Sequence, residues 1–140
     1  MSLSIYQRHL DTIPKQYQLL KLFRPPIYVI ELSNNQVSSV CYYKDGSSKR
    51  HQVNAAFSNR RMVIADFLSA VQAITDLLLK FPKHPFGISS FAVVNVTEEL
   101  IDGLTMIEIK AIREAVWAAS GQAKRRIVSS TVNYQGQVVS

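Results

Sequence analysis

The amino-acid sequence predicts one α/β domain built on a mixed sheet of about five strands. Three short β-rich stretches come first, and helix and strand patterns then alternate, in the order β-β-β-α-β-α-β after an N-terminal helix. A hairpin meander followed by alternating helices and strands places the later strands parallel to one another. The length of 140 residues suits a single domain, and 47% hydrophobic with 19% charged residues is typical of a chain with a core.

The three early strands are predicted from their β-branched and aromatic residues and from the turns between them. They span residues 27–32, 37–43 and 48–54. Asp45-Gly46 is a strong two-residue hairpin signal between the second and the third strand. The third strand is poor in apolar residues, which predicts that it lies at an edge of the sheet.

Two helices are predicted downstream, each with its own start signal. The first covers about residues 66–81, with Asp66 as N-cap and apolar residues at helical spacing. The second begins at the capping box formed by Thr105 and Glu108. Gly121 is expected to end it, because glycine readily adopts the left-handed conformation at a helix end.

The remaining strands follow these helices. The apolar run 91–94 predicts a strand buried on both faces, and residues 126–132 predict the last strand. The residues after it form either a short hairpin around Gly136 or a loose tail. The predicted parts of the chain are therefore an N-terminal segment at 1–26, an α/β domain at 27–132 and a C-terminal piece at 133–140.

Residues 15–24 predict a short basic amphipathic helix, which Pro25-Pro26 ends. The net charge of +6 lies entirely in residues 1–65, which hold nine Lys or Arg against three Asp or Glu. This asymmetry indicates either an anionic contact or a basic surface kept for solubility. The candidate partner or membrane contacts in this segment are Lys15, Leu19, Leu20, Lys21, Leu22, Phe23 and Arg24.

Trp117 is a further candidate partner contact, because tryptophan is enriched at interface hot spots. It lies about 100° around the second helix from Val116, so it belongs either at the edge of the core or in solvent. The single cysteine, Cys41, is expected to be a small core residue. The three histidines show no metal-ligand spacing and are expected at the surface.

Three stretches together resemble the bacterial rod-shape-determining actin homologue MreB. Val63 to Phe67 is similar to the segment that opens that family's first long helix, and Lys110 to Ala115 is similar to its second helix. Phe91 to Val94 lies where the family has its central buried strand. The resemblance covers about residues 19–130 and implies a ribonuclease-H-like, actin-like half-domain. It also implies membrane contact by the basic segment before the first strand.

The match fails where the family carries its chemistry. The family's Asp-Leu-Gly-Thr turn, which cradles a phosphate, corresponds to Glu31-Leu32-Ser33-Asn34 here. Ser33 carries a Cβ that hinders the close approach of a phosphate to the backbone. The acidic segment after the last strand and the second lobe of the nucleotide cleft have no counterpart. We therefore expect no catalytic residues, no cofactor and no enzymatic activity.

The resulting hypothesis is a non-catalytic protein-interaction module linked to bacterial cell-shape, division or envelope assemblies. Its partner is an unidentified protein, and a homodimer through an open sheet edge is a further candidate. No apolar run approaches the roughly 18–20 residues needed to span a bilayer, and no signal-peptide pattern is present. A cytoplasmic location is expected, with the inner face of the membrane as a candidate place.

Two alternatives remain at the sequence level. The basic N-terminal part could bind a membrane surface or nucleic acid, although the basic clusters at 60–61 and 124–126 lack stacking aromatics, so a nucleic-acid partner is not expected. A metal-dependent nuclease of the same fold class would use Glu31, Asp66 and either Glu98 or Glu99. The simpler interpretation is that Asp66 caps a helix and that the two glutamates belong to a solvated turn.

Overall fold

The computed structural model describes residues 2–13, 15–58, 63–84, 88–97, 103–135 and 137–139, with side chains from residue 5 onward. Its helical elements are α1 (Ser2–Asp11), the 3₁₀ turn η1 (Lys15–Tyr17), α2 (Gln18–Leu22), α3 (Phe67–Leu79) and α4 (Met106–Ala123). Its strands are β1 (Ile27–Ser33), β2 (Gln36–Tyr42), β3 (Ser48–Asn54), β4 (Ser90–Val96), β5 (Ile127–Tyr134) and β6 (Gln137–Val138).

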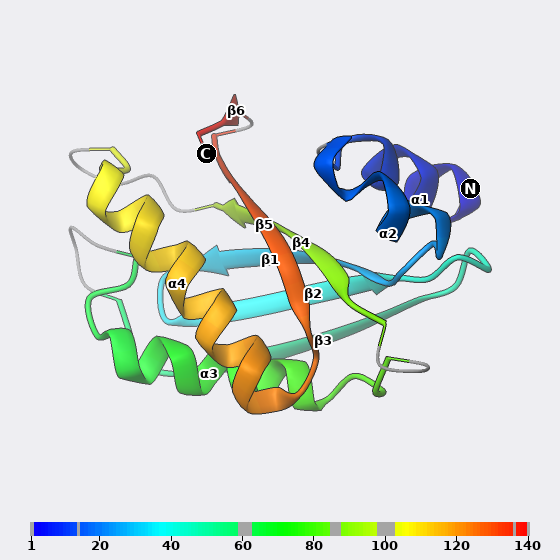
Figure 1. Ribbon diagram of the computed structural model, residues 1–140. Helices are drawn as coiled ribbons and strands as arrows, with labels where there is room; N and C mark the ends of the chain where they lie inside the picture. The colour runs from blue at the N-terminus through cyan, green and yellow to red at the C-terminus, as the bar shows by residue number, and fades with distance from the viewer. Residues whose placement is uncertain are drawn as a thin grey trace.

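The strands form one mixed sheet in the order β3-β2-β1-β4-β5-β6. The pairs β1–β2, β2–β3 and β5–β6 are antiparallel, whereas β1–β4 and β4–β5 are parallel. This is the strand order of a ribonuclease-H-like, actin-like half-domain, so the predicted fold class is confirmed. Figure 1 shows α3 and α4 side by side against one face of the sheet and the N-terminal helices at its opposite face.

The main core lies between the sheet and the pair α3–α4. Alternate residues of β1, namely Tyr28, Ile30 and Leu32, point into it because successive side chains of a strand face opposite ways. Both predicted helix starts are confirmed. The Asp66 side chain accepts a hydrogen bond from the Ser69 N–H at 3.0 Å, and the capping box of α4 is complete.

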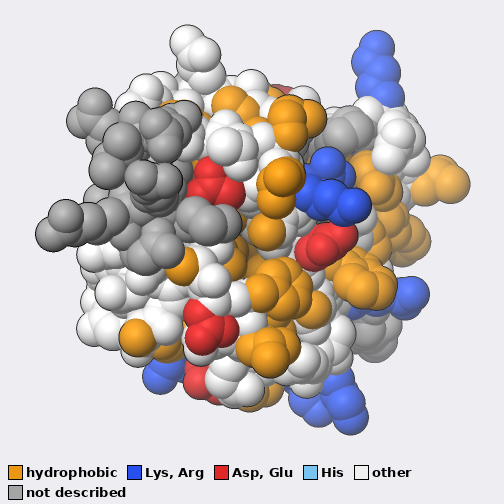
Figure 2. Space-filling model, turned by 90° about the vertical axis from the view of Figure 1, so that its left-hand side faces the viewer, with side chains coloured by type: hydrophobic (Ala, Val, Ile, Leu, Met, Phe, Trp, Pro, Cys, Tyr) orange, Lys and Arg blue, Asp and Glu red, His pale blue; other side chains and the backbone are white. Residues whose placement is uncertain are grey.

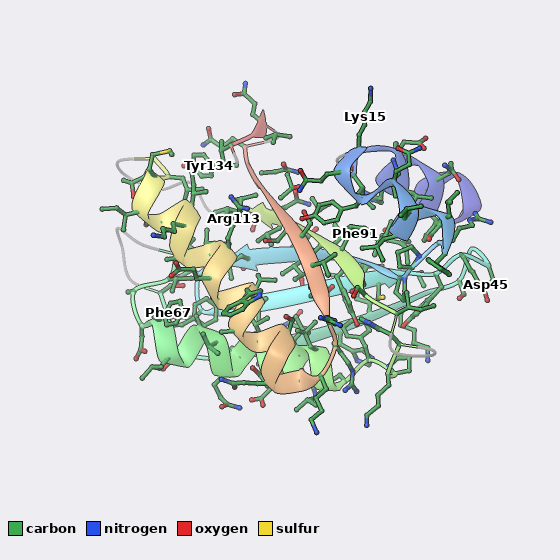
Figure 3. All side chains as sticks on the ribbon, viewed as in Figure 1. Lys15, Asp45, Phe67, Phe91, Arg113 and Tyr134 are labelled. Carbon is green, nitrogen blue, oxygen red and sulfur yellow. The ribbon has the colours of Figure 1, made fainter. Side chains whose placement is uncertain are left out.

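A second, smaller core lies on the opposite face of the sheet. Tyr6, Leu10 and Ile13 of the N-terminal segment are buried there against Ile27 of β1 and Phe91 of β4. Figure 3 shows Phe91 on the side of the sheet that faces the N-terminal helices. Helix α1 therefore packs onto the sheet as part of the folded unit.

The expected end of α4 is revised, and the form of the C-terminal residues is decided. Helix α4 continues past Gly121 to Ala123, and Lys124 takes the left-handed conformation instead, with φ 56°. The Arg125 N–H then bonds to the Ser120 carbonyl at 3.1 Å, which closes a Schellman motif. Of the two alternatives for the C-terminal residues the structure has the hairpin, since β6 pairs with the end of β5 and adds a sixth strand to the sheet.

The expectation of surface histidines is wrong for His84, whereas Cys41 is buried as expected. His84 is half-buried, and its Nδ1 lies 2.8 Å from the Ile88 carbonyl oxygen. Nδ1 must therefore carry the proton, and Nε2 accepts from the Tyr28 hydroxyl at 2.8 Å. Burial lowers the pKa of His84 below its usual value. This histidine is consequently a neutral link between β1 and the segment before β4.

Candidate interaction surfaces

The β1–β2 turn occupies the position where the resemblance places a phosphate cradle. Asn35 has a left-handed backbone with φ 55°, and its N–H donates to the Ser58 hydroxyl at 3.0 Å. Its side-chain oxygen accepts from the N–H groups of Phe57 and Ser58 at 3.0 and 2.8 Å. Ser33 ends β1 beside this turn, and Asn34 is exposed. The polar groups of Asn35 are thus engaged with the chain that follows β3.

Glu31 does not meet the other carboxylates of the nuclease hypothesis. It is exposed on the sheet face opposite α3 and α4, whereas Asp66 caps α3 on the far side. The neighbour of Glu31 on β4 is Asn95, which accepts a hydrogen bond from Asn133 at 3.0 Å. Glu98 and Glu99 lie outside the described residues. Within the described ranges no cluster of three potential metal ligands occurs.

The predicted N-terminal contact residues divide into two sets. Leu19, Leu22 and Phe23 are exposed to 77%, 74% and 62%. Leu20 instead packs against the second core, and the Lys21 ammonium lies 3.4 Å from the Ile13 carbonyl oxygen. Lys15 is exposed, and the Arg24 guanidinium stacks over the Tyr6 ring at 5.4 Å.

Phe23, one of the three exposed apolar residues, lines a basic hollow. A cavity of about 370 Å³ lies between Phe23, the two prolines that follow Arg24, and the β2–β3 hairpin. Arg24, Lys44 and Lys49 line this cavity together with a single acid, Asp45. Among the residues that the structure describes, no helix has the length and apolar character needed to cross a bilayer. The surface has the composition of an interfacial contact.

A larger groove of about 750 Å³ runs between the outer face of α4 and β5. Met106, Ile107 and Trp117 expose 78%, 78% and 73% of their surfaces along it. Figure 2 views the molecule from the side on which α4 begins, and it shows hydrophobic side chains gathered across that face with both basic and acidic ones beside them. Trp117 therefore lies in solvent, which decides between the two positions that the sequence left open.

A second hollow of about 930 Å³ continues toward the C-terminal end of α4. It shares Trp117, Ile127 and Val128 with the first, so the indole stands between the two. Lys124 and Arg126 line this second hollow. The two hollows together form one surface, which we call the α4 groove.

The other residues of the α4 groove were not singled out from the sequence. Arg113 and Glu114 lie about one helical turn from Trp117 on the outer face of α4, and Lys110 lies about two turns away. Figure 3 shows Arg113 near β5. The available signal was Ile107, which falls outside the buried stripe of α4 and shares the spacing of Lys110, Glu114 and Trp117. This outer stripe recurs every three or four residues.

The basic cluster at 124–126 is divided between the surface and the interior. Lys124 and Arg126 are exposed, but Arg125 is 7% exposed and its guanidinium bonds to two backbone carbonyls. One member of the cluster is therefore structural. The other basic cluster, at 60–61, lies outside the described residues.

No protein-family model matches the sequence, and no curated protein matches it. Among solved structures, the chain is similar to the ethanolamine utilization protein EutJ from Carboxydothermus hydrogenoformans, with a TM-score of 0.48 at 15% sequence identity. The similarity covers 78% of this chain and 37% of that chain.

Proposed function

We propose that this chain is a non-catalytic module that binds a partner protein through the α4 groove. The observation that carries the proposal is Trp117, a large aromatic side chain left 73% exposed between two hollows. Exposed aromatic residues on a rigid scaffold are typical of interface hot spots. Helix α4 is such a scaffold, because Ile109, Ile112 and Val116 on its inner face are buried.

Two features favour binding over nucleotide chemistry. The position of the family's phosphate-approach glycine is Ser33, and the turn beside it is tied by Asn35 to Phe57 and Ser58. A phosphate at this turn would have to displace bonds that the chain already makes. The α/β fold of this chain therefore serves to bind a protein and not a nucleotide.

We expect a photoreactive benzoylphenylalanine at position 114 to form a discrete protein adduct in the cells that make this chain. Glu114 lies in the groove and is exposed, so its replacement leaves the core intact. The adduct should disappear when Trp117→Ala is added, because the indole is the proposed anchor. Gel shift and mass spectrometry provide the measurement.

The matched control carries the same photoreactive residue at position 72, an exposed site on α3 away from the groove. No adduct at either position, or equal adducts at both, would contradict a partner on the α4 groove. A cell-shape, division or envelope assembly is the partner class suggested by the resemblance of residues 63–67, 91–94 and 110–115. The identity of the adduct tests that extension, and an adduct of twice the chain mass would indicate the predicted homodimer.

A second candidate function, contact with a membrane surface, is favoured by Leu19, Leu22 and Phe23. These three apolar side chains are exposed, and Phe23 lines a hollow together with Arg24 and Lys44. An apolar surface with a basic rim suits anionic lipid. We expect the double variant Leu22→Glu/Phe23→Glu to lower binding to phosphatidylserine vesicles roughly tenfold in co-sedimentation.

The control for this prediction is Leu79→Glu, which places one charge on a half-exposed apolar site of α3. Binding should weaken at high salt, because the basic side chains act through screened electrostatics. Equal binding of the double variant and the control would remove the N-terminal segment as the membrane contact.

A further inference from the structure

The outer edge of β5 is open for a short stretch within the α4 groove. At one end the Tyr17 hydroxyl donates to the Val128 carbonyl at 3.4 Å. At the other end the Val139 N–H donates to the Val132 carbonyl at 2.9 Å. Alternate residues of a strand direct their N–H and C=O groups to the same side, so those of Ser130 point outward between these two contacts. Among the residues that the structure describes, no strand pairs with the backbone of Ser130 on this side of β5.

This edge and the apolar wall of α4 face the same space. Ser130 lines the groove together with Ile107 and Trp117. A chain laid along β5 in extended form would meet the edge with its backbone. Every second side chain of such a segment would point toward α4, because strand side chains alternate. The groove thus offers both contacts that strand addition uses.

The charges that line the groove have mainly one sign. Lys110 and Arg113 lie in the first hollow, and Lys124 and Arg126 lie in the second. Glu114 is the single acid among the described lining residues, which leaves a net charge of +3. Its carboxylate lies 3.9 Å from the Lys110 ammonium. A binding partner whose charge complements that of the groove is therefore acidic.

On the basis of the function proposed above, we propose that the α4 groove binds an extended, acidic segment of a partner protein. The segment lies along β5 and hydrogen-bonds to the backbone of Ser130. Its alternate apolar side chains pack on Trp117 and Ile107, and its carboxylates pair with Lys110 and Arg113.

A second copy of this chain fits the groove less well. A two-fold contact would bring the groove against itself, and a surface of charge +3 would then face an equal one. The chain as a whole also carries +6. Like charges across an interface oppose association, so the charge pattern favours a different protein.

The test is a selection of random twelve-residue peptides displayed on phage against the purified full chain, with Trp117→Ala for counter-selection. We expect enriched peptides to be rich in Asp and Glu and to carry apolar residues at every second position. Leu79→Ala removes a half-exposed apolar residue from α3 and should leave binding of these peptides unchanged.

A charge-reversed chain, Lys110→Glu/Arg113→Glu, sharpens the test. It should bind the acidic peptides about tenfold more weakly and select basic peptides in their place. N-methylation scanned along a selected peptide should abolish binding at one position, that of the amide which donates to the Ser130 carbonyl, because the carbonyls of Val128 and Val132 already accept bonds within the chain.

The outcomes separate the two proposals. Apolar residues spaced by three or four would indicate a helix, and the absence of acidic enrichment would remove the charge argument. Either result would contradict the proposal that the groove binds an extended acidic segment. If the Trp117-dependent adduct at position 114 still forms, the proposed protein-binding function is retained. Unaltered selection by the charge-reversed chain also overturns the acidic segment. Absence of both selected peptides and the adduct overturns both proposals.

Discussion

Replacing Arg125 by methionine should lower the free energy of unfolding by about 2–4 kcal/mol. The guanidinium donates to the Phe81 carbonyl through Nη2 at 2.8 Å and through Nε at 3.3 Å, and to the Ala123 carbonyl through Nη1 at 2.7 Å. These carbonyls belong to the C-terminal ends of α3 and α4. The buried guanidinium of Arg125 thus donates to carbonyls that have no partner within their helices. Its positive charge also interacts favourably with the negative ends of two helix dipoles. Methionine keeps the apolar stem and leaves the carbonyls without their donor.

Urea unfolding followed by circular dichroism measures this effect, with the midpoint expected to fall and the slope to stay constant. The neighbouring Arg126 is exposed, and Arg126→Ala should change stability by less than about 0.5 kcal/mol. Arg125→Lys keeps the charge without the fork that reaches both carbonyls, so we expect only partial recovery. Equal midpoints for Arg125→Met and Arg126→Ala would show that the bridge contributes nothing to stability.

Most of the fold was predictable because its signals are local. Thr105 and Glu108 are three residues apart, and the Ser47 N–H bonds to the Asp45 side chain within the hairpin connection 43–47. This connection is longer than the two-residue turn that Asp45-Gly46 predicts. The alternation of helices and strands after the hairpins also predicted that the later strands are parallel, as the pairs β1–β4 and β4–β5 are. The low apolar content of residues 48–54 also places β3 at the sheet edge, as the structure confirms.

The features that escaped prediction depend on partners far along the chain. Arg125 meets Phe81, 44 residues away, and His84 meets Tyr28 at a separation of 56. Helix α4 ends at Ala123 and not at Gly121, and the longer helix places Arg125 against the carbonyl of Phe81, just after α3. Contacts between residues this far apart leave no local sequence pattern, so the burial of Arg125 within the basic cluster at 124–126 could not be predicted.

The candidate site was predictable only in part for the same reason. Trp117 was named from its residue type, but its exposure depends on how α4 packs against β5. The groove also needs the open edge at Ser130, which exists because Tyr17 and Val139 occupy only the two ends of that stretch. The sequence therefore indicates Trp117 as a candidate contact residue, whereas the groove around it is formed only by the tertiary structure.

Replacing Tyr6 by alanine should destabilise the chain by about 3–5 kcal/mol, the usual range for loss of a buried aromatic residue. Tyr6 is 0% exposed, packs in the second core with Leu10 and Ile13, and donates to the Pro25 carbonyl at 2.7 Å. Because these contacts attach α1 to the sheet, hydrogen exchange should become faster in residues 5–22 before it does in α3 and α4. Exchange followed by mass spectrometry distinguishes local release from global unfolding.

Tyr6→Phe is the matched control, because it removes only the hydroxyl and should cost about 1 kcal/mol. It also remains measurable if the alanine variant does not fold. Unchanged exchange and unchanged stability for Tyr6→Ala would mean that residues 5–22 form an appended arm rather than a part of the folded unit. That distinction bears on function, since Tyr17 reaches the α4 groove and Leu19, Leu22 and Phe23 form the candidate membrane contact. If Tyr6 anchors this segment as expected, both candidate surfaces are held by one rigid body, and losing the anchor should weaken each of them.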